Sequence, residues 1–169
     1  MALALDWFLL PKRDEGWTVE EAVTDEQLRG HAFVSAVVWE LDPASTETAV
    51  EERRDYVALP TRRGSFLVVR DGATYVGNAS CRISSDGRTP YLIGGAALPE
   101  YRRQGVYRAL LTYRLGLARN HGCDLLTTQA RADTSEPILR SFGFKEHDLL
   151  PMLVKDRNDL VGEETLNFI

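Results

Sequence analysis

Three arginines lie close to one glycine in the second half of the chain, and this grouping is the clearest sign of a binding site. Arg102 and Arg103 precede Gly105, and Arg108 follows it at the start of a predicted helix. The first N–H groups of a helix have no acceptor within the helix, and the peptide dipoles add about half a positive charge at that end. Glycine lets a ligand approach the backbone closely. The grouping therefore predicts a pyrophosphate site, in a chain whose net charge is −5.

The predicted elements on either side place this turn between a strand and a helix. The apolar run at residues 92–98 predicts a buried strand that a proline ends. The helix after Gly105 has one broad apolar face and a natural stop at Gly122. Gly94 and Gly95 interrupt the strand, which indicates either a bulge with close approach of a ligand or tight packing against a helix.

The same stretch resembles the signature of the GNAT superfamily of acetyl-CoA-dependent N-acetyltransferases, Gln/Arg-x-x-Gly-x-Gly/Ala, which lies between the fourth strand and the next helix of that fold. In this chain it reads Arg102-Arg103-Gln104-Gly105-Val106-Tyr107. Tyr107 departs from the usual Gly or Ala. Phe142-Gly143-Phe144 also matches the Leu-Gly-Phe that ends the family's last helix. The resemblance implies an α+β sandwich, with a mixed, mostly antiparallel sheet flanked by helices, over residues 18–155.

The resemblance also implies that acetyl-CoA is the co-substrate. In the family, pantetheine pairs with the exposed backbone of the fourth strand, where one N–H faces the thioester oxygen, and the diphosphate binds the amides that follow. By this similarity the cofactor-binding residues are Ala97, Leu98, Arg102, Arg103, Gln104, Gly105, Val106, Tyr107 and Arg108.

Two residues that many family members use for proton transfer are missing here. Leu139 stands where a tyrosine usually protonates the leaving thiolate, and the strand at 92–98 contains no acid that could act as a base. Tyr107, at the helix start, is a candidate proton donor, although its ring could simply pack on the cofactor. Glu40 and Asp42 could hold or deprotonate a cationic acceptor amine, or they could be solvated loop residues.

Composition bounds the remaining possibilities. A length of 169 residues suits one domain, so we expect a GNAT domain at 18–155 between an extension at 1–17 and a tail at 156–169. The acidic net charge argues against nucleic-acid binding, and no apolar run is long enough to span a membrane. Cysteines and histidines are scattered, so we expect no metal and buried, inert thiols at Cys81 and Cys123. The cytoplasm is the default location, and a homodimer is left open.

The other predicted elements follow the order of the same fold. They are a strand at 18–22, a helix to about residue 39, a second helix ending before residue 60, strands at 65–70, 74–84 and 125–129, a helix ending at 143, and closing strands from 144 and at 151–155. Residues 2–10 could add a strand or a packed extension.

Turn and cap residues fix several of these boundaries. Thr24 or Asp25 would cap the first helix, and Ser45 or Thr46 the second. Asp71-Gly72 is predicted to form a two-residue hairpin turn.

Two functions fit these features. The first is an N-acetyltransferase that moves the acetyl group of acetyl-CoA directly to a primary amine of a small molecule or peptide. The second is a GNAT-fold module that binds CoA or acyl-CoA with little turnover, which the missing acid and Leu139 favour. Phosphate-loop nucleotide hydrolysis is excluded, because the chain has no GxxxxGK[ST] motif.

Overall fold

A six-stranded sheet forms the centre of the protein, with strands in the order β1-β6-β5-β4-β3-β2. The structure is a computed structural model that describes residues 1–5 and 16–147. The strands are β1 (Ala2–Ala4), β2 (Val19–Glu21), β3 (Gly64–Asp71), β4 (Thr74–Ile83), β5 (Pro90–Ala97) and β6 (Leu125–Thr128). All neighbours pair antiparallel except β5 and β6, which are parallel. β3, β4 and β5 therefore form an antiparallel meander, and the predicted mixed, mostly antiparallel sheet is confirmed.

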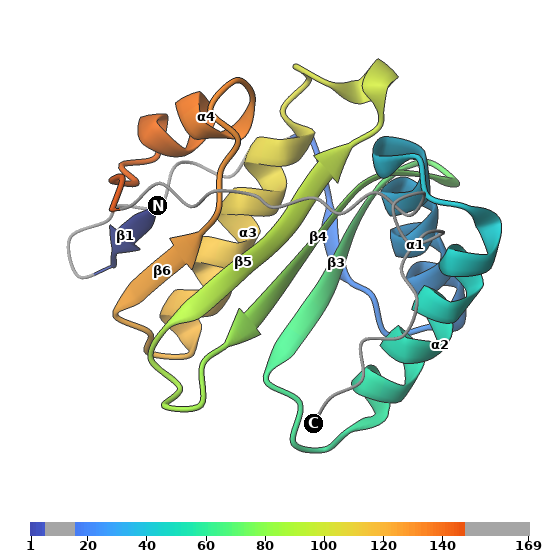
Figure 1. Ribbon diagram of the computed structural model, residues 1–169, viewed down its shortest axis with the longest axis horizontal. Coiled ribbons are helices and arrows are strands. Elements are labelled where there is room, and N and C mark those ends of the chain that lie inside the picture. The colour runs from blue at the N-terminus through green and yellow to red at the C-terminus, as the bar shows by residue number, and fades with distance from the viewer. Residues whose placement is uncertain (6–15, 148–169) are drawn as a thin grey trace, which may run out of the picture.

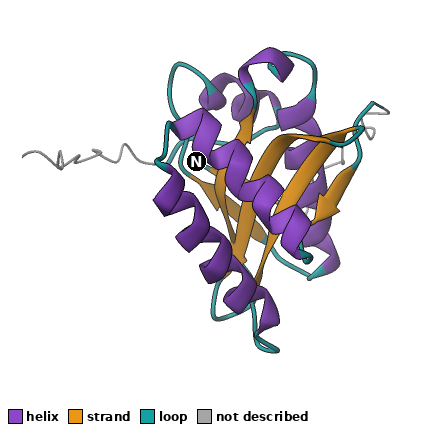
Figure 2. Cartoon of the chain, turned by 90° about the vertical axis from the view of Figure 1, so that its right-hand side faces the viewer, coloured by secondary structure: helices purple, strands orange, loops and turns teal. Residues whose placement is uncertain are grey.

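Helices cover both faces of this sheet. They are α1 (Asp25–Trp39), α2 (Pro43–Ala58), α3 (Val106–Asn120) and α4 (Ser135–Ser141). Alternation along β3 separates the two layers, because Phe66 and Val68 pack in one core cluster with residues of α1 and α2, whereas Leu67 and Val69 pack with residues of α3 on the opposite face. Figure 1 shows α3 behind β5 and β6, and Figure 2 shows α1 and α2 running side by side in front of the strands.

Side-chain caps start the first two helices. Thr24 caps α1 in a capping box with Gln27, as one of the two predicted alternatives requires. The predicted cap of α2 was wrong, since Asp42 rather than Ser45 or Thr46 occupies that position. The Asp42 carboxylate accepts from the Ser45 amide at 2.9 Å, and the helix begins one residue later at a proline, which suits a first helical position because it has no N–H to leave unpaired.

The β3–β4 hairpin turns one residue later than predicted. Asp71 pairs with Thr74, so the two-residue loop is Gly72-Ala73 rather than Asp71-Gly72. Gly72 has φ +57°, a conformation that glycine adopts at little cost. The loop is still a two-residue hairpin.

The N-terminal residues add an edge strand. β1 pairs antiparallel with β6, which confirms the strand expected within residues 2–10 as far as the structure describes them. The strand predicted from residue 144 is present as one bridge between Lys145 and Ala2. The predicted strand at 151–155 and tail at 156–169 lie outside the described residues.

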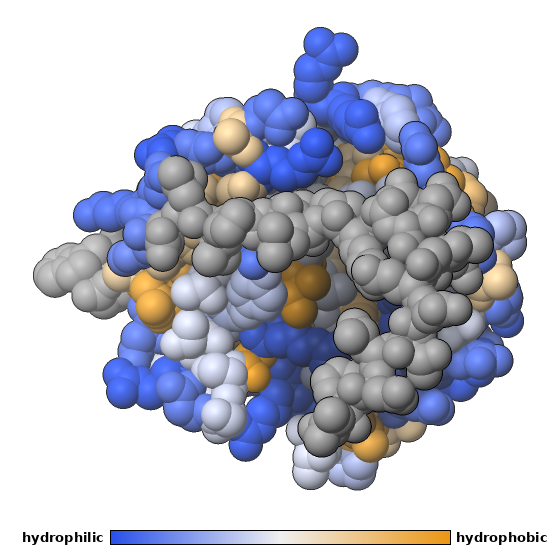
Figure 3. All heavy atoms as spheres, in the orientation of Figure 1, coloured by the Kyte–Doolittle hydropathy of each residue, from blue (hydrophilic) through white to orange (hydrophobic). Residues whose placement is uncertain are grey.

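The surface carries several exposed apolar side chains near the end of α1. Phe33, Val37, Trp39 and Leu41 are all more than two-fifths exposed. Figure 3 shows polar residues over much of the visible face, with apolar side chains gathered over the end of α1. No helix within residues 1–5 and 16–147 has the length and apolar character that a bilayer crossing requires.

A buried polar network joins α1 to β4. The Nε2 atom of His31 lies 3.2 Å from both the Ala79 carbonyl oxygen and the Ser80 hydroxyl. The Asn78 amide donates to the His31 carbonyl at 2.7 Å and to the Ser35 hydroxyl at 2.6 Å. Burial, together with the charge of nearby Arg53, lowers the pKa of His31 to about 3, so the ring is neutral at neutral pH.

This depressed pKa makes the stability of the fold sensitive to acid. Between the ordinary His pKa of 6.5 and the folded value of about 3, the unfolded chain binds the proton more tightly, so stability falls as pH is lowered through this window. The loss approaches about 1.4 kcal/mol per pH unit. We expect His31→Gln to flatten the pH dependence of the free energy of unfolding between pH 6.5 and 4.5, measured by urea denaturation. His121→Gln, at an exposed site, should leave the slope of the wild type, and equal slopes in all three proteins would contradict the prediction.

Candidate functional site

The turn between β5 and α3 has an unusual backbone. Arg103 has φ +62° and Gly105, the N-cap of α3, has φ +90°. Within the described part of the chain, the amides of Val106, Tyr107 and Arg108 have no hydrogen-bond acceptor. Free amides at the start of a helix form a site that favours an anion.

Interactions from distant parts of the chain hold this turn in place. Trp17 donates from its indole N–H to the Gln104 carbonyl at 2.7 Å, and its ring meets Tyr101 edge-on at 6.0 Å. The Tyr101 hydroxyl donates to the Asp71 carboxylate at 3.1 Å. The sequence analysis missed Trp17, because no local pattern indicates a contact with residues so far along the chain.

A glycine in β4 sets the position of the first turn of α3. A Cβ on Gly77 would lie 2.4 Å from the Val106 side chain, so only glycine lets the helix start approach the sheet this closely. Val106 is buried, whereas Arg108, two residues on, is exposed. The turn and the helix start are therefore rigidly attached to the sheet.

Positive charge surrounds the free amides. Arg102, Arg103 and Arg108 are exposed, and none forms an ion pair with a carboxylate of the described residues. The Arg108 guanidinium lies over the Phe142 ring at 5.3 Å. The first turn of α3 has no acid. The predicted arginines thus come together at one helix start in a chain that is acidic overall.

Among the described residues, one edge of β5 has no strand partner over most of its length. β6 pairs with it only at Tyr91 and Leu92, while β5 continues to Ala97. Leu98 donates to the Val76 carbonyl at 2.9 Å and accepts from the Tyr101 amide, so its backbone groups are already used. Because hydrogen bonding alternates along an antiparallel pair, the backbone groups of Ala97 face away from β4 toward the open edge. Of the two strand residues predicted to bind the cofactor, only Ala97 has a free amide.

A bulge interrupts β5 where the strand begins to leave β6. The register with β4 shifts between Asn78 and Ser80, so Gly94 and Gly95 together oppose Ala79. Both glycines have positive φ, +57° and +141°. A Cβ on Gly94 would touch the ring of Trp39, and one on Gly95 would lie 3.0 Å from the Tyr107 ring. The glycine pair therefore marks a bulge, and the side chains of two helices pack against it.

Tyr107 and Arg114, both from α3, converge on this bulge. The Arg114 side chain is 1% exposed; it donates from Nη1 to the Gly94 carbonyl at 3.0 Å and from Nε to the Leu110 carbonyl at 3.3 Å. Its guanidinium carbon lies 6.0 Å from the centre of the half-buried Tyr107 ring. The structure thus places Tyr107 beside the bulge, and the sequence analysis missed Arg114.

No side chain of the described residues near the bulge is an activated nucleophile. Burial raises the pKa of the Cys81 thiol to about 11, which keeps it protonated and inert. Burial is also the main cause that raises the pKa of Cys123. Leu139 is buried in the core cluster against which Tyr107 packs, so Tyr107 and the position of the family's missing tyrosine belong to the same packed region. Residues 1–5 and 16–147 contain no group of three or more His, Cys, Asp or Glu that could hold a metal ion.

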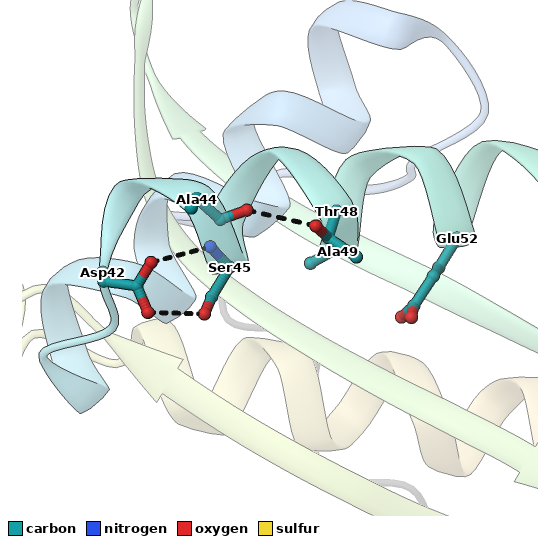
Figure 4. A pocket seen from close by; sticks show the side chains of 6 residues that line it. All are labelled: Asp42, Ala44, Ser45, Thr48, Ala49 and Glu52. Atoms are coloured by element: carbon teal, nitrogen blue, oxygen red, sulfur yellow. Dashed lines mark hydrogen bonds between the residues drawn. The ribbon is translucent and has the colours of Figure 1, made fainter.

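The two predicted acceptor residues lie in the α1–α2 connection and differ in their surroundings. Glu40 is the exposed C-cap of α1, directly after Trp39, whose ring contacts the bulge. Asp42 caps α2 through the Ser45 amide and hydroxyl. Figure 4 shows this cap and an open depression along one side of α2, lined by Asp42, Ala44, Ser45, Thr48, Ala49 and Glu52. Asp42 therefore has a structural role at the start of α2.

Taken together, the site has the parts that transfer of an activated acyl group needs. It offers an anion-binding turn, an unpaired strand edge that leads away from that turn, and a bulge with a phenol and a guanidinium beside it. Such a site can hold a long phosphorylated ligand along β5 and position its far end at the bulge.

Comparisons with known proteins agree with this arrangement. A family model described as "Acetyltransferase (GNAT) family" matches residues 30–144. No curated protein matches the sequence. Solved structures resemble the fold at low sequence identity.

Three of these structures show the extent of the likeness. An aminoglycoside 6'-N-acetyltransferase from Acinetobacter baumannii is 19% identical, with a TM-score of 0.64 over 83% of this chain and 99% of that chain. An acetyltransferase from Trypanosoma brucei is 19% identical, with a TM-score of 0.64 over 82% and 99%. An aminoglycoside acetyltransferase from an uncultured soil metagenomic sample, in complex with sisomicin, is 16% identical, with a TM-score of 0.69 over 86% and 100%.

Because the N-cap of α3 has a left-handed backbone conformation, any residue other than glycine at position 105 should lower the stability of the protein. We expect Gly105→Ala to lower the free energy of unfolding by about 1–2 kcal/mol, measured by urea denaturation, because alanine is strained at φ +90°. Gly116 lies inside the same helix with no atom near its absent Cβ, so Gly116→Ala should stabilise by up to about 1 kcal/mol. A neutral or stabilising Gly105→Ala would show that the turn does not depend on this conformation.

Proposed function

Because this chain belongs to the acetyltransferase (GNAT) family, we propose that it transfers the acetyl group of acetyl-CoA directly to a primary amine in a ternary complex. One observation carries the proposal: the free amides at the start of α3 and the unpaired edge of β5 follow one another along the chain, from Ala97 to Arg108. The diphosphate of CoA needs the free amides, and its extended pantetheine arm needs the unpaired strand edge beside them.

The proposed binding mode uses the described residues in two ways. The amides of Val106, Tyr107 and Arg108 would donate hydrogen bonds to the diphosphate, with the three arginines adding positive charge. Ala97 would exchange hydrogen bonds with pantetheine, as an added strand does at an open sheet edge. Leu98 has no part in this binding mode, since its amide already donates to the Val76 carbonyl.

The transfer step needs positioning more than covalent help from the protein. The neutral amine nitrogen attacks the thioester carbonyl carbon, which forms a C–N bond and a tetrahedral oxyanion. The C–S bond then breaks, the sulfur leaves with the electron pair as the CoA thiolate, and this thiolate takes up a proton. The nitrogen gives up its extra proton to water or a base. Direct transfer also fits the protonated, inert state of Cys81.

Tyr107 is the proposed proton donor to the thiolate. Its ring lies beside Gly95 in the bulge and packs against the core cluster that contains Leu139. A phenol supplied by α3 can therefore reach the neighbourhood where the family's usual donor, replaced here by Leu139, would stand.

The acceptor amine is proposed to approach from the α1–α2 side of the bulge. Trp39 contacts the bulge there, and the exposed Glu40 carboxylate follows it in the chain. An acid beside an aromatic ring favours a cationic amine. Aminoglycosides are therefore suitable first probes, since two of the similar structures are named as acetyltransferases of that class.

CoA binding is the first test. At a CoA concentration 100 times its Kd, we expect the melting temperature to rise by about 5–10 °C. Gly105→Glu should abolish the rise, because its carboxylate would repel the diphosphate, whereas Gly116→Glu on the same helix should keep it. A wild-type protein whose melting temperature does not change would overturn the proposed function.

Turnover is the second test. Release of free thiol from acetyl-CoA should be stimulated by at least one amine among sisomicin, spermidine, lysine and a peptide with a free N-terminus. CoA binding without thiol release for any of these amines would instead favour the binding module, for which the buried Leu139 and the acid-free β5 are the supporting observations.

The role of Tyr107 is tested by removing its hydroxyl. We expect Tyr107→Phe to lower kcat by about 100-fold or more and to change the pH profile of kcat, with CoA affinity retained, since only proton transfer is lost. Tyr113→Phe, at another half-buried tyrosine of α3, is the matched control and should keep the wild-type rate. An unchanged rate and pH profile in Tyr107→Phe would remove Tyr107 as the acid.

A further inference from the structure

Arg114 carries a buried positive charge that has no counter-ion in the described structure. Its side chain is 1% exposed, and no carboxylate of the described residues forms an ion pair with it. Its hydrogen-bond acceptors are two backbone carbonyls, the Tyr107 phenol also interacts with the guanidinium, and Nη2, although buried, has no acceptor within hydrogen-bond distance. A buried guanidinium without a counter-ion lowers the free energy of unfolding, so the fold retains Arg114 although it reduces stability.

The unpaired nitrogen points at the bulge of β5. A Cβ built on Gly95 would lie 3.1 Å from Nη2 and 3.0 Å from the Tyr107 ring. Since glycine has no such atom, the guanidinium and the phenol flank the same small space outside the Gly95 backbone. Negative charge placed there would supply what Arg114 lacks.

Arg114 also holds one particular peptide unit of the bulge. Nη1 donates to the Gly94 carbonyl at 3.0 Å, and the N–H of that same peptide belongs to Gly95. The peptide is trans, as are all those described, so its N–H points away from Arg114 and toward the opposite face of the sheet. A charged donor on the carbonyl polarises the peptide and makes its N–H a stronger donor.

We propose that Arg114 is a positioning residue for the acetyl-transfer step: it fixes and polarises the Gly94–Gly95 peptide so that the Gly95 N–H serves as the oxyanion donor. This inference rests on the proposed function. The thioester of acetyl-CoA is neutral, and negative charge appears there only on the tetrahedral oxyanion and the leaving thiolate. A peptide N–H that a buried cation polarises from the other side therefore stabilises the transition state more than the ground state.

The test compares Arg114→Met with the wild type in two ways. With saturating acetyl-CoA and the fastest amine of the panel, kcat should fall by about 100-fold, while the Kd for CoA stays close to that of the wild type. In the infrared spectrum of bound acetyl-CoA labelled with ¹³C at the thioester carbonyl, the carbonyl stretch should move to higher frequency in the variant, because the oxyanion donor is weaker. The second readout needs no acceptor.

Stability separates this role from a merely structural one. Replacing a buried unpaired cation by an apolar side chain should leave the melting temperature of Arg114→Met unchanged or raised while kcat falls. Arg114→Lys, which keeps the charge, should recover part of both the rate and the infrared shift, and it serves as the comparison should the methionine variant not fold. Arg119→Met, at an exposed arginine of the same helix, should behave as the wild type.

The outcomes are distinguishable from failure of the proposed function. A wild type that does not bind acetyl-CoA overturns both proposals. A wild type that binds and turns over acetyl-CoA, together with a folded Arg114→Met of equal kcat and equal carbonyl frequency, overturns the role of Arg114 alone. If both kcat and the melting temperature of Arg114→Met fall while the carbonyl frequency stays that of the wild type, the role of Arg114 is also overturned.

Discussion

The separation of β5 from β6 after Leu92 is the constraint on which the rest of the site depends. Two parallel strands that stayed paired would use every backbone group of β5 and leave no surface for a ligand. Because β5 and β6 separate, the backbone of Ala97 is exposed, and the residues after it lead directly to the free amides at the start of α3. The bulge at Gly94-Gly95 lies where this separation begins. Strand edge, bulge and helix start therefore form one continuous feature.

Helices on the two faces of the sheet support this feature in different ways. From α1, His31 and the Asn78 network tie the helix to β4 beside the bulge with neutral groups, and Trp39 contacts the bulge itself. From α3, Arg114 brings a formal charge to the other face.

Local patterns in the sequence predicted the elements that local physics determines. The strand, basic turn and helix around Gly105 could be predicted because each depends on neighbouring residues, and so could the glycine-rich bulge. The capping role of Asp42 was not predicted, because an aspartate before a proline and a serine resembles many other loop patterns, and its role toward the acceptor stays a prediction. Trp17 and Arg114 could not be predicted, since their contacts join segments that only the folded sheet brings together. Nothing in a helical arginine indicates whether it lies buried against a strand.

The placement of β1 has a consequence for the order in which the chain assembles. The Met1 amino group donates to the Thr128 carbonyl, 127 positions further along, and Ala2–Ala4 pair with β6 residues that are 121 to 125 positions further along. During synthesis this strand leaves the ribosome early and cannot pair until nearly all of the domain has followed it. The β3–β4–β5 meander needs no such wait, because its partners are adjacent in sequence. The ribosome therefore delivers the strand edge proposed to bind the coenzyme before the outermost strand of the sheet can close.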